Sequence, residues 1–426
     1  GIDLFLEKLV QETEKEHEDI LEQADETDAV FGELYSWYLR NPEYRSRVQK
    51  LVQSAFAGKP KDIISQSVAK ALYGEVSPYS ATRLERFAAC AFAHFLQYGM
   101  KLTERVEYEF KPMDMGNVMH EALESFAEEV RKRGMKWTEL TEQERNEIAD
   151  RCLDNIVADY GNTVLKSSAR NEYMIERTRR ILRRTVWALQ KQLEQGEFQP
   201  EGFEVTFGGG RIDRVDIMED QNKVYVKVID YKTGNTSFDL VYLYHGLQLQ
   251  LMIYLDGALR VEQKKYPDKE IIPAGVFYYN IKDPMIQEKI DADVKAVSAG
   301  LMKELKMNGL VQADPELVYR MDSSLGSIPV AFNKDGSFRK NSSVADRTQF
   351  AVLGRYVRTK IEKIRSSILE GDAEVSPYEL GKKNACTYCP YMTVCGFDRR
   401  LSGYEFRRLK NFSDEELWKA FDREAE

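Results

Sequence analysis

The sequence predicts an α/β fold in which helices flank a mixed central sheet. Residues 203–234 alternate between apolar and polar side chains or run in β-branched residues, with turn signals at 208–210 and 219–223. This pattern predicts two or three antiparallel strands. Helical periodicity precedes this stretch and returns after it, before a further strand. Strands with helices on both sides in the sequence favour an α/β arrangement.

The N-terminal part of the chain, residues 1–76, is expected to form a helical segment. It is highly charged, and the stretch FGELYSWYLRNPEYRSRVQKLVQSAF carries apolar residues at spacings of three and four. Pro78 then interrupts the pattern, and Ser80 is a candidate N-cap for the next helix. We therefore expect a domain border near Glu75. Because the chain begins at Gly1 within a helical pattern, we also expect it to be a piece of a longer protein.

The central elements are expected in the following order. Residues 115–193 have a helical pattern whose mostly apolar face includes His120. The strands within 203–234 come next, and the stretch HGLQLQLMIYLDGALR, residues 245–260, predicts a helix. Residues 274–282, AGVFYYNIK, are rich in aromatic and β-branched side chains and predict another strand.

The composition is typical of a soluble globular protein. The chain has 426 residues, of which 43% are hydrophobic and 31% charged, enough for about two or three packed units. It has no uninterrupted apolar run long enough to cross a bilayer and no N-terminal signal pattern. We therefore expect a cytoplasmic protein without a membrane partner. Five cysteines in such a chain argue against a disulfide framework.

The net charge of −9 is weak evidence against nucleic-acid binding, because a local basic patch is sufficient. One candidate patch lies in ERTRRILRRTVWALQKQ, where Arg177, Arg180 and Arg184 recur at helical spacing and would line a DNA-binding groove. The alternative is a solvated helix face that binds nothing.

Three charged residues, Asp213, Asp230 and Lys232, fall where the pattern predicts a buried sheet. Burying a charge without a partner is costly, so a cation or an ion pair is expected there. Residues two apart on a strand point to the same face. If the two strands pair as a hairpin, both carboxylates converge on one site for a hard cation, Mg²⁺ above all, beside an ammonium that orients a water. The Tyr231 carbonyl is a further candidate ligand, and the alternative is a structural Asp–Lys pair.

The motifs GRIDRVD and VIDYKTG resemble the two metal motifs of the PD-(D/E)XK nucleases, in the branch of RecB-like and AddB-like helicase–nuclease subunits. The stretch GNVMHEALE is similar to the helix on which that family has a metal-binding histidine, and it places His120 at that position. HGLQLQLMIYL resembles the Gln-and-Tyr helix of the family, which implies that Gln250 and Tyr254 face the active site. Gln248 is one register off.

The resemblance implies a fold and a mechanism. The fold is a PD-(D/E)XK nuclease core with a mixed central sheet flanked by helices, preceded by the N-terminal helical segment. Magnesium, or Mn²⁺ or Ca²⁺ in its place, would be held by His120, Asp213, Asp230 and the Tyr231 carbonyl, and Lys232 would position the attacking water. The implied catalytic set is Asp213, Asp230, Lys232, Gln250 and Tyr254.

The cysteines narrow the resemblance. Cys386, Cys389 and Cys395 are spaced Cys-x2-Cys-x5-Cys, and Cys90 lies far upstream in YSATRLERFAACAFAHFLQYGM. This split resembles the AddB-type subunit of the bacterial AddAB (RexAB-like) helicase–nuclease, in which four thiolates hold a 4Fe-4S cluster. Zinc also accepts four thiolates, and reduced, unligated cysteines are a further alternative. The family commonly has proline after the first cysteine, whereas this chain has Ala91.

Neither the fifth cysteine nor any nucleotide-binding motif predicts a further functional site. Cys152 falls inside a predicted helix and is expected to be a buried apolar residue. The sequence contains no Gly-x4-Gly-Lys-Ser/Thr phosphate loop, so no ATP hydrolysis is expected in this chain. Residues 1–76 would then be the tail of a helicase-like region, 77–400 a nuclease domain closed by the four-cysteine cluster, and 401–426 a C-terminal helical tail.

The function implied is that of a metal-dependent DNA exonuclease domain. It would cut single strands from an unwound duplex in partnership with an AddA-type helicase–nuclease subunit, and so process double-strand breaks for recombinational repair in bacteria. Two alternatives come from other functional classes. One is a non-catalytic DNA-binding module stapled by the cluster, and the other is a zinc-stabilised protein-interaction scaffold.

Overall fold

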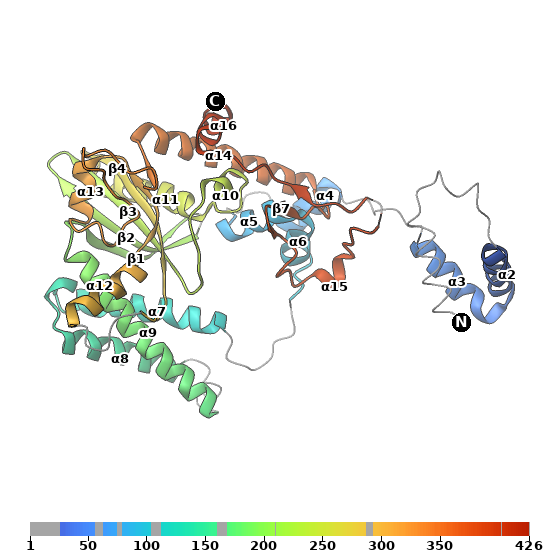
Figure 1. Cartoon of the computed structure of the whole chain (residues 1–426), viewed down its shortest axis with the longest axis horizontal. Helices are drawn as coiled ribbons and strands as arrows, with labels where there is room; N and C mark the ends of the chain where they lie inside the picture. The colour runs from blue at the N-terminus through green and yellow to red at the C-terminus, as the bar shows by residue number, and fades with distance from the viewer. Residues whose placement is uncertain are drawn as a thin grey trace. The chain divides into compact units, whose positions relative to one another are not determined.

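The computed structural model describes residues 26–55, 63–74, 79–103, 112–159, 168–208, 210–286, 293–401 and 403–425. By contacts, the chain divides into two compact units (Figure 1). The first comprises Gly1–Tyr73, Ala89–Leu102 and Ser367–Lys410, and the second comprises Gly74–Ala88, Thr103–Ser366 and Asn411–Glu426. This division cuts across the domain boundaries expected at residues 76 and 400, which stay predictions. Glu75 and Pro78 lie outside the described residues.

The second unit is built on a six-stranded sheet with the strand order β1-β2-β3-β4-β5-β6. The first three strands are antiparallel, β3 pairs with β4 in parallel, and β4–β5 and β5–β6 are antiparallel and parallel. The predicted mixed sheet is therefore confirmed. The strands are β1 (Gln199–Phe207), β2 (Gly210–Asp220), β3 (Lys223–Lys232), β4 (Glu270–Asn280), β5 (Asn308–Gln312) and β6 (Val344–Ala345).

Helices cover both faces of this sheet (Figure 1). On one side lie α7 (Pro112–Lys132), α8 (Glu142–Asp159) and α9 (Ala169–Leu193), which is how the helical pattern predicted over 115–193 is realised. On the other side α11 (Gln250–Lys265) packs against β2, β3 and β4. The remaining elements that lie wholly or mostly in this unit are α5 (Ala81–Ala89), η2 (Trp137–Glu139), α10 (Leu240–Tyr244), α12 (Val294–Glu304), α13 (Pro315–Met321), α14 (Arg347–Glu370) and α16 (Asp414–Ala425).

The two sheet faces follow from the alternation of side chains along each strand. One face carries Met218, Tyr225, Ile229 and Phe277, which are buried in one apolar core with α7, α8 and α9. The residues between them point the opposite way, toward α11. Asp213 and Asp230 belong to this second set, so the charged motifs lie under α11 rather than in the main core.

A buried ionic group, Arg214, Asp216 and Lys227, lies on the core face of the same two strands. Arg214 donates two hydrogen bonds to the Asp216 carboxylate, at 2.5 and 2.9 Å, and Lys227 Nζ lies 3.0 Å from Asp216 Oδ2. All three side chains are buried. Removing one partner of such a group leaves the other buried charges unpaired, which lowers the free energy of unfolding by roughly 3–5 kcal/mol. The group therefore resists any change in the pairing of β2 with β3.

The predicted helix over 245–260 begins later than expected. The structure has α10 ending at Tyr244 and α11 beginning at Gln250. Gly246 adopts a φ of 78°, and the Leu247 N–H donates to the Tyr242 carbonyl at 2.8 Å. This is the arrangement by which a glycine in the left-handed region terminates a helix. The periodicity of the sequence continued through the turn, so it did not reveal the break.

The first unit contains α2 (Glu26–Arg40), α3 (Pro42–Ala55), α4 (Gln66–Tyr73), α6 (Ala91–His94), the π-helix η1 (Phe95–Gly99) and α15 (Met392–Cys395). A three-stranded sheet of order β8-β7-β9 joins Lys383–Asn384, Tyr378–Leu380 and Arg407–Arg408. The helical prediction for 1–76 is confirmed where the chain is described, and its residues 1–25, 56–62, 75 and 76 lie outside the described part.

Ser80 caps α5 as expected. Its Oγ accepts a hydrogen bond from the Arg83 N–H at 3.3 Å, which gives a partner to one of the first N–H groups of the helix. Within the described residues, no helix is both long enough and apolar enough to cross a bilayer.

Candidate active site

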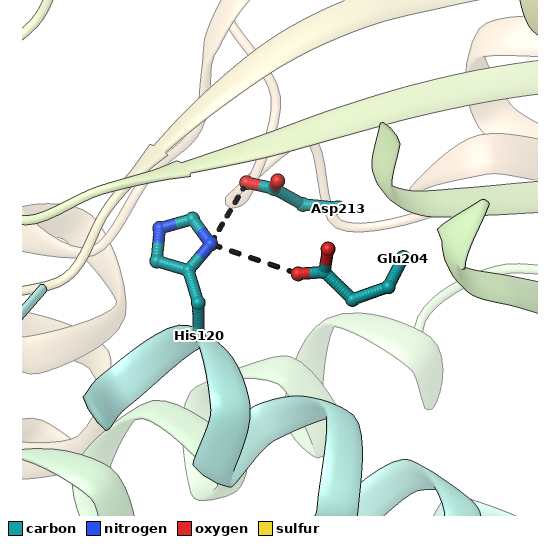
Figure 2. A group of neighbouring side chains, drawn as sticks. All are labelled: His120, Glu204 and Asp213. Carbon is teal, nitrogen blue, oxygen red and sulfur yellow. Dashed lines mark ion pairs between the residues drawn. The ribbon is translucent and has the colours of Figure 1, made fainter. Parts of the chain in front are cut away.

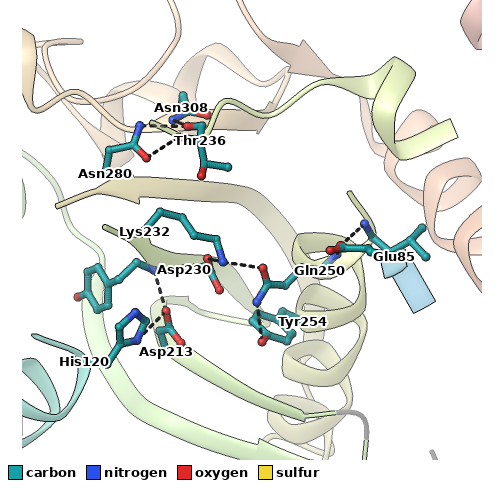
Figure 3. A network of polar contacts seen from close by, with 12 residues as sticks. Glu85, His120, Asp213, Asp230, Lys232, Thr236, Gln250, Tyr254, Asn280 and Asn308 are labelled. Atoms are coloured by element: carbon teal, nitrogen blue, oxygen red, sulfur yellow. Dashed lines mark hydrogen bonds and ion pairs between the residues drawn. The ribbon is translucent and has the colours of Figure 1, made fainter. Parts of the chain in front are cut away.

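The antiparallel pairing of β2 with β3 brings the two aspartates together. Arg214 pairs with Ile229, so the preceding residue, Asp213, lies opposite Asp230. Asp213 is 8% exposed and Asp230 is 1% exposed. The predicted convergence of these carboxylates on one face is therefore confirmed (Figure 3). Two facing carboxylates in a buried position are unfavourable unless nearby positive charge or a proton compensates them.

The pKa of Asp230 reflects the closeness of the two carboxylates. Burial and the negative charge of Asp213 raise the pKa of Asp230 to about 7, although Lys232 opposes both. Lys232 Nζ lies 2.7 Å from Asp230 Oδ2. Lys232 and a protonated His120 supply positive charge here, and the carboxylate oxygens are hard donors of the kind that a divalent cation prefers. The residues present therefore fit a divalent cation.

His120 approaches Asp213 and Glu204 from α7 (Figure 2). Its Nδ1 lies 3.4 Å from Asp213 Oδ2 and 3.9 Å from Glu204 Oε1. Burial acts to lower the pKa of His120, but the carboxylates of Asp213 and Glu204 outweigh it and raise the pKa to about 10. The histidine thus lies in a strongly negative environment, beside the carboxylate at which it was predicted.

Glu204 is a member of this group that the sequence did not reveal. The possible ligand atoms of His120, Glu204 and Asp213 all lie within 4.8 Å of one another (Figure 2). On β1 the neighbours of Glu204 pair with the neighbours of Asp213, so these two residues are opposite each other as well. Glu204 also pairs with Arg211 and has a φ of 48°. A side chain in the left-handed region is strained, and such strain is common at functional sites.

The Tyr231 backbone is fixed by Asp213. The Tyr231 N–H donates to Asp213 Oδ2 at 2.7 Å. In a strand, the N–H and C=O of one residue point to the same side, so the Tyr231 carbonyl also faces the Asp213 side. This orientation is the one that the predicted ligand role requires.

Lys232, Gln250 and Tyr254 form a chain of hydrogen bonds (Figure 3). Lys232 Nζ donates to Gln250 Oε1 at 2.7 Å, and Gln250 Nε2 donates to the Tyr254 hydroxyl at 2.8 Å. The predicted pair one helical turn apart on α11 thus faces the site. Burial raises the pKa of Tyr254, so its hydroxyl keeps its proton. The Lys232 ammonium is held between Asp230 and an amide that is itself oriented.

Gln248 does not join this chain. Its Oε1 accepts from the Asp239 N–H at 2.9 Å and its Nε2 donates to the Ser237 carbonyl at 2.9 Å. It therefore stabilises the loop before α10, in agreement with its being one register off.

The loop that follows Lys232 is clamped by two asparagines that the sequence did not single out (Figure 3). The Thr236 N–H donates to Asn280 Oδ1 at 3.1 Å, and the Thr236 carbonyl accepts from Asn280 Nδ2 at 3.0 Å and Asn308 Nδ2 at 2.9 Å. The end of β3 is therefore tied to β4 and β5, which restricts the backbone beside Lys232.

The three arginines predicted to contact DNA lie on α9. Arg177 and Arg180 are exposed and Arg184 is partly exposed. Arg180 Nε donates to Asp283 Oδ2 at 2.6 Å, and Arg184 lies over the Trp187 ring. The neighbouring arginines of α9 instead pair with α8, Arg179 with Asp154 and Arg183 with Asp150. The two sets of arginines thus occupy different faces of the helix.

The four cysteines all belong to the first unit. Burial raises the pKa of Cys386 to about 11, and the other three, Cys90, Cys389 and Cys395, contribute to the increase. Cys90 and Cys389 also take part in one small apolar cluster. The structure therefore brings together residues separated by nearly the whole nuclease-like region of the sequence. Cys152 is buried in the core of the second unit, as predicted.

Residues 78–396 match the model of the PD-(D/E)XK nuclease superfamily. The chain is 41% identical over 423 residues to the B subunit of an ATP-dependent helicase/deoxyribonuclease from Lachnoclostridium phytofermentans, covering 94% of this chain and 36% of that protein. It is 33% identical over 425 residues to the protein of the same name from Thermoanaerobacter sp. (strain X514), covering 94% and 37%. It is 34% identical over 424 residues to the protein of the same name from Alkaliphilus metalliredigens, covering 93% of this chain and 37% of that protein. The chain spans a little over a third of the length of these relatives.

The strained carboxylate of Glu204 yields a prediction. Glu204→Gly should not lower the melting temperature in EDTA, because relief of the left-handed strain, roughly 1–2 kcal/mol, offsets the extra backbone freedom of glycine. The same change should reduce the increase in melting temperature that a saturating divalent cation produces, because a candidate ligand is lost. Thermal denaturation with and without Mg²⁺ or Mn²⁺ measures both effects.

Lys101→Gly is the matched control, because Lys101 is exposed and has a φ of 53°. It should leave the response to the cation unchanged. A Glu204→Gly variant with the full wild-type response would remove Glu204 from the candidate ligands.

Proposed function

The chain belongs to the PD-(D/E)XK nuclease superfamily, and we propose that it is the nuclease domain of an AddB-type helicase–deoxyribonuclease subunit. It would degrade DNA single strands released from an unwound duplex, beside an AddA-type partner in the bacterial cytoplasm, during recombinational repair of double-strand breaks. The observation that carries the proposal is the facing pair Asp213 and Asp230 with the Lys232 ammonium beside it. The similarity to the B subunits of ATP-dependent helicase/deoxyribonucleases supports the helicase partner.

We infer that the cation is Mg²⁺, with Mn²⁺ or Ca²⁺ as substitutes. The residues that would hold it are Asp213, Asp230, His120 and the Tyr231 carbonyl, and Glu204 is now added to them. The chemistry that such a cation supplies when bound is charge neutralisation at the scissile phosphate and a lower pKa of water.

The protein's own groups would orient the reaction. Lys232 is held by Gln250 at a fixed point beside Asp230, so its ammonium can hold a water or stabilise negative charge on the phosphate. The Tyr254 hydroxyl stays protonated and neutral, and it fixes the Gln250 amide by accepting a hydrogen bond from it. A non-catalytic DNA-binding module would not need this second layer of hydrogen bonds around Lys232.

We also propose that Arg177, Arg180 and Arg184 contact the DNA backbone. They lie on the face of α9 that the aspartates of α8 do not neutralise, and two of them are exposed. Arg180 would exchange its bond to Asp283 for a phosphate.

We further propose that Cys90, Cys386, Cys389 and Cys395 hold a 4Fe-4S cluster. Their thiols are electrostatic neighbours, which supports a shared ligand. A ligand set made of cysteines alone suits such a cluster. Zinc, which also accepts four thiolates, belongs to the scaffold alternative.

The proposed chemistry predicts that Asp213→Asn, Asp230→Asn and Lys232→Ala each reduce Mg²⁺-dependent digestion of labelled single-stranded DNA by roughly a hundredfold or more. The aspartate variants should keep their melting temperature in EDTA, because each removes one of two buried like charges. Asp220→Asn is the control, since Asp220 lies on the same strand β2 but pairs with Arg320 at the surface. Digestion at the wild-type rate by any of the three site variants would contradict the proposed nuclease site.

The cluster predicts that serine at Cys90 or Cys389 lowers iron content, sulfide content, visible absorbance and melting temperature together. Crosslinking Cys90 to Cys386 closes a loop of nearly three hundred residues, which adds roughly 6 kcal/mol to the free energy of unfolding in the chain-entropy model. Cys152→Ser is the control and should keep the full iron content. Zinc without iron or sulfide in anaerobically purified protein would contradict the cluster while leaving the nuclease site unaffected.

A further inference from the structure

The N-terminus of α11 is capped by a residue from a distant part of the chain. One carboxylate oxygen of Glu85, on α5, accepts hydrogen bonds from the Leu249 N–H at 2.7 Å and the Gln250 N–H at 2.9 Å (Figure 3). Leu249, the N-cap residue itself, offers no side-chain hydrogen bond. The first N–H groups of a helix have no partner within the helix, so Glu85 supplies what the local sequence lacks.

The capped residue is also the one that orients Lys232. Gln250 is the first residue of α11, and its side chain accepts from Lys232 Nζ at 2.7 Å and donates to Tyr254. A shift of the first helical turn would move the Gln250 amide away from Lys232. Gln250 therefore links Glu85 to Lys232: its backbone N–H is bound by Glu85, and its side-chain oxygen accepts from the Lys232 ammonium.

The charges around Glu85 connect it with the same site. Burial raises the pKa of Glu85 to about 7 although the two N–H groups act to lower it, and beyond them Lys232 lowers it and Asp230 raises it. A carboxylate placed at a helix N-terminus is also favoured by the helix dipole. Glu85 thus lies within the electrostatic field of Lys232 and Asp230, while the two N–H groups that it accepts from belong to the start of α11.

We propose that Glu85 is a positioning residue of the nuclease site, which fixes the first turn of α11 so that Gln250 holds Lys232 in place. This inference rests on the proposed function. A merely structural cap would stabilise α11 but would not act on the reaction through Gln250. The two roles differ in whether the effects of changing Glu85 and Gln250 are independent.

A double-mutant cycle in the full chain separates the two roles. Glu85→Ala should lower kcat for Mg²⁺-dependent digestion of single-stranded DNA about tenfold, with KM within about twofold of the wild-type value, because DNA binding is not its task. In the Gln250→Ala background, the same change should lower kcat by no more than about twofold. A loss of kcat that persists undiminished in that background would overturn the inference.

Two further variants complete the experiment. Glu85→Gln keeps an oxygen that accepts both N–H bonds, so it should retain most of the wild-type kcat; a kcat as low as that of Glu85→Ala would contradict the positioning role. Asp314→Ala removes a comparable cap, since Asp314 accepts from the Glu316 and Leu317 N–H groups at the start of α13. It should lower the melting temperature and leave kcat unchanged.

The outcomes also distinguish this inference from the proposed function. A wild-type chain that fails to digest DNA with Mg²⁺ would contradict the function itself. A wild-type chain that digests DNA, with Glu85→Ala indistinguishable from Asp314→Ala in kcat, would overturn only the role of Glu85.

Discussion

The burial of Asp213 opposite Asp230 determines how the rest of the second unit must be built. Two carboxylates that face each other under α11 repel one another, and burial adds to the cost of their charge. Such a pair persists only if the surrounding structure holds its backbone firmly and positive charge compensates it. The first condition is met by the pairing of β2 with β3, and the second by Lys232 and His120, which lie beside the two carboxylates.

The register of β2 against β3 is secured from the opposite face. A slip of one residue would move every side chain to the other side of the sheet. Such a slip would drive Asp213 into the apolar core and break the buried contacts of Asp216 with Arg214 and Lys227. The ionic group on the core face therefore protects the charged pair on the site face. The second aspartate of GRIDRVD has a structural task, whereas the first faces the site.

Much of this arrangement could be predicted from the sequence, because it is encoded locally. Alternation over 203–234 predicted the strands, and the spacing of Asp213, Asp230 and Lys232 predicted their shared face once a hairpin was assumed. The residues that escaped prediction are determined by tertiary structure. Glu204 looks like any polar residue of an alternating strand until its strained backbone and its position opposite Asp213 are known. Glu85 meets Gln250 across 165 residues, a separation that no local pattern encodes.

If Asp213 and Asp230 are held together in order to bind one divalent cation, a crystal soaked in Mn²⁺ should reveal that cation by anomalous diffraction. We predict one strong peak within coordinating distance of both carboxylates, with His120, Glu204 or the Tyr231 carbonyl completing the shell. Manganese bound elsewhere in the same crystal, with no peak between Asp213 and Asp230 and with the Lys232–Asp230 pair intact, would contradict the proposed metal site.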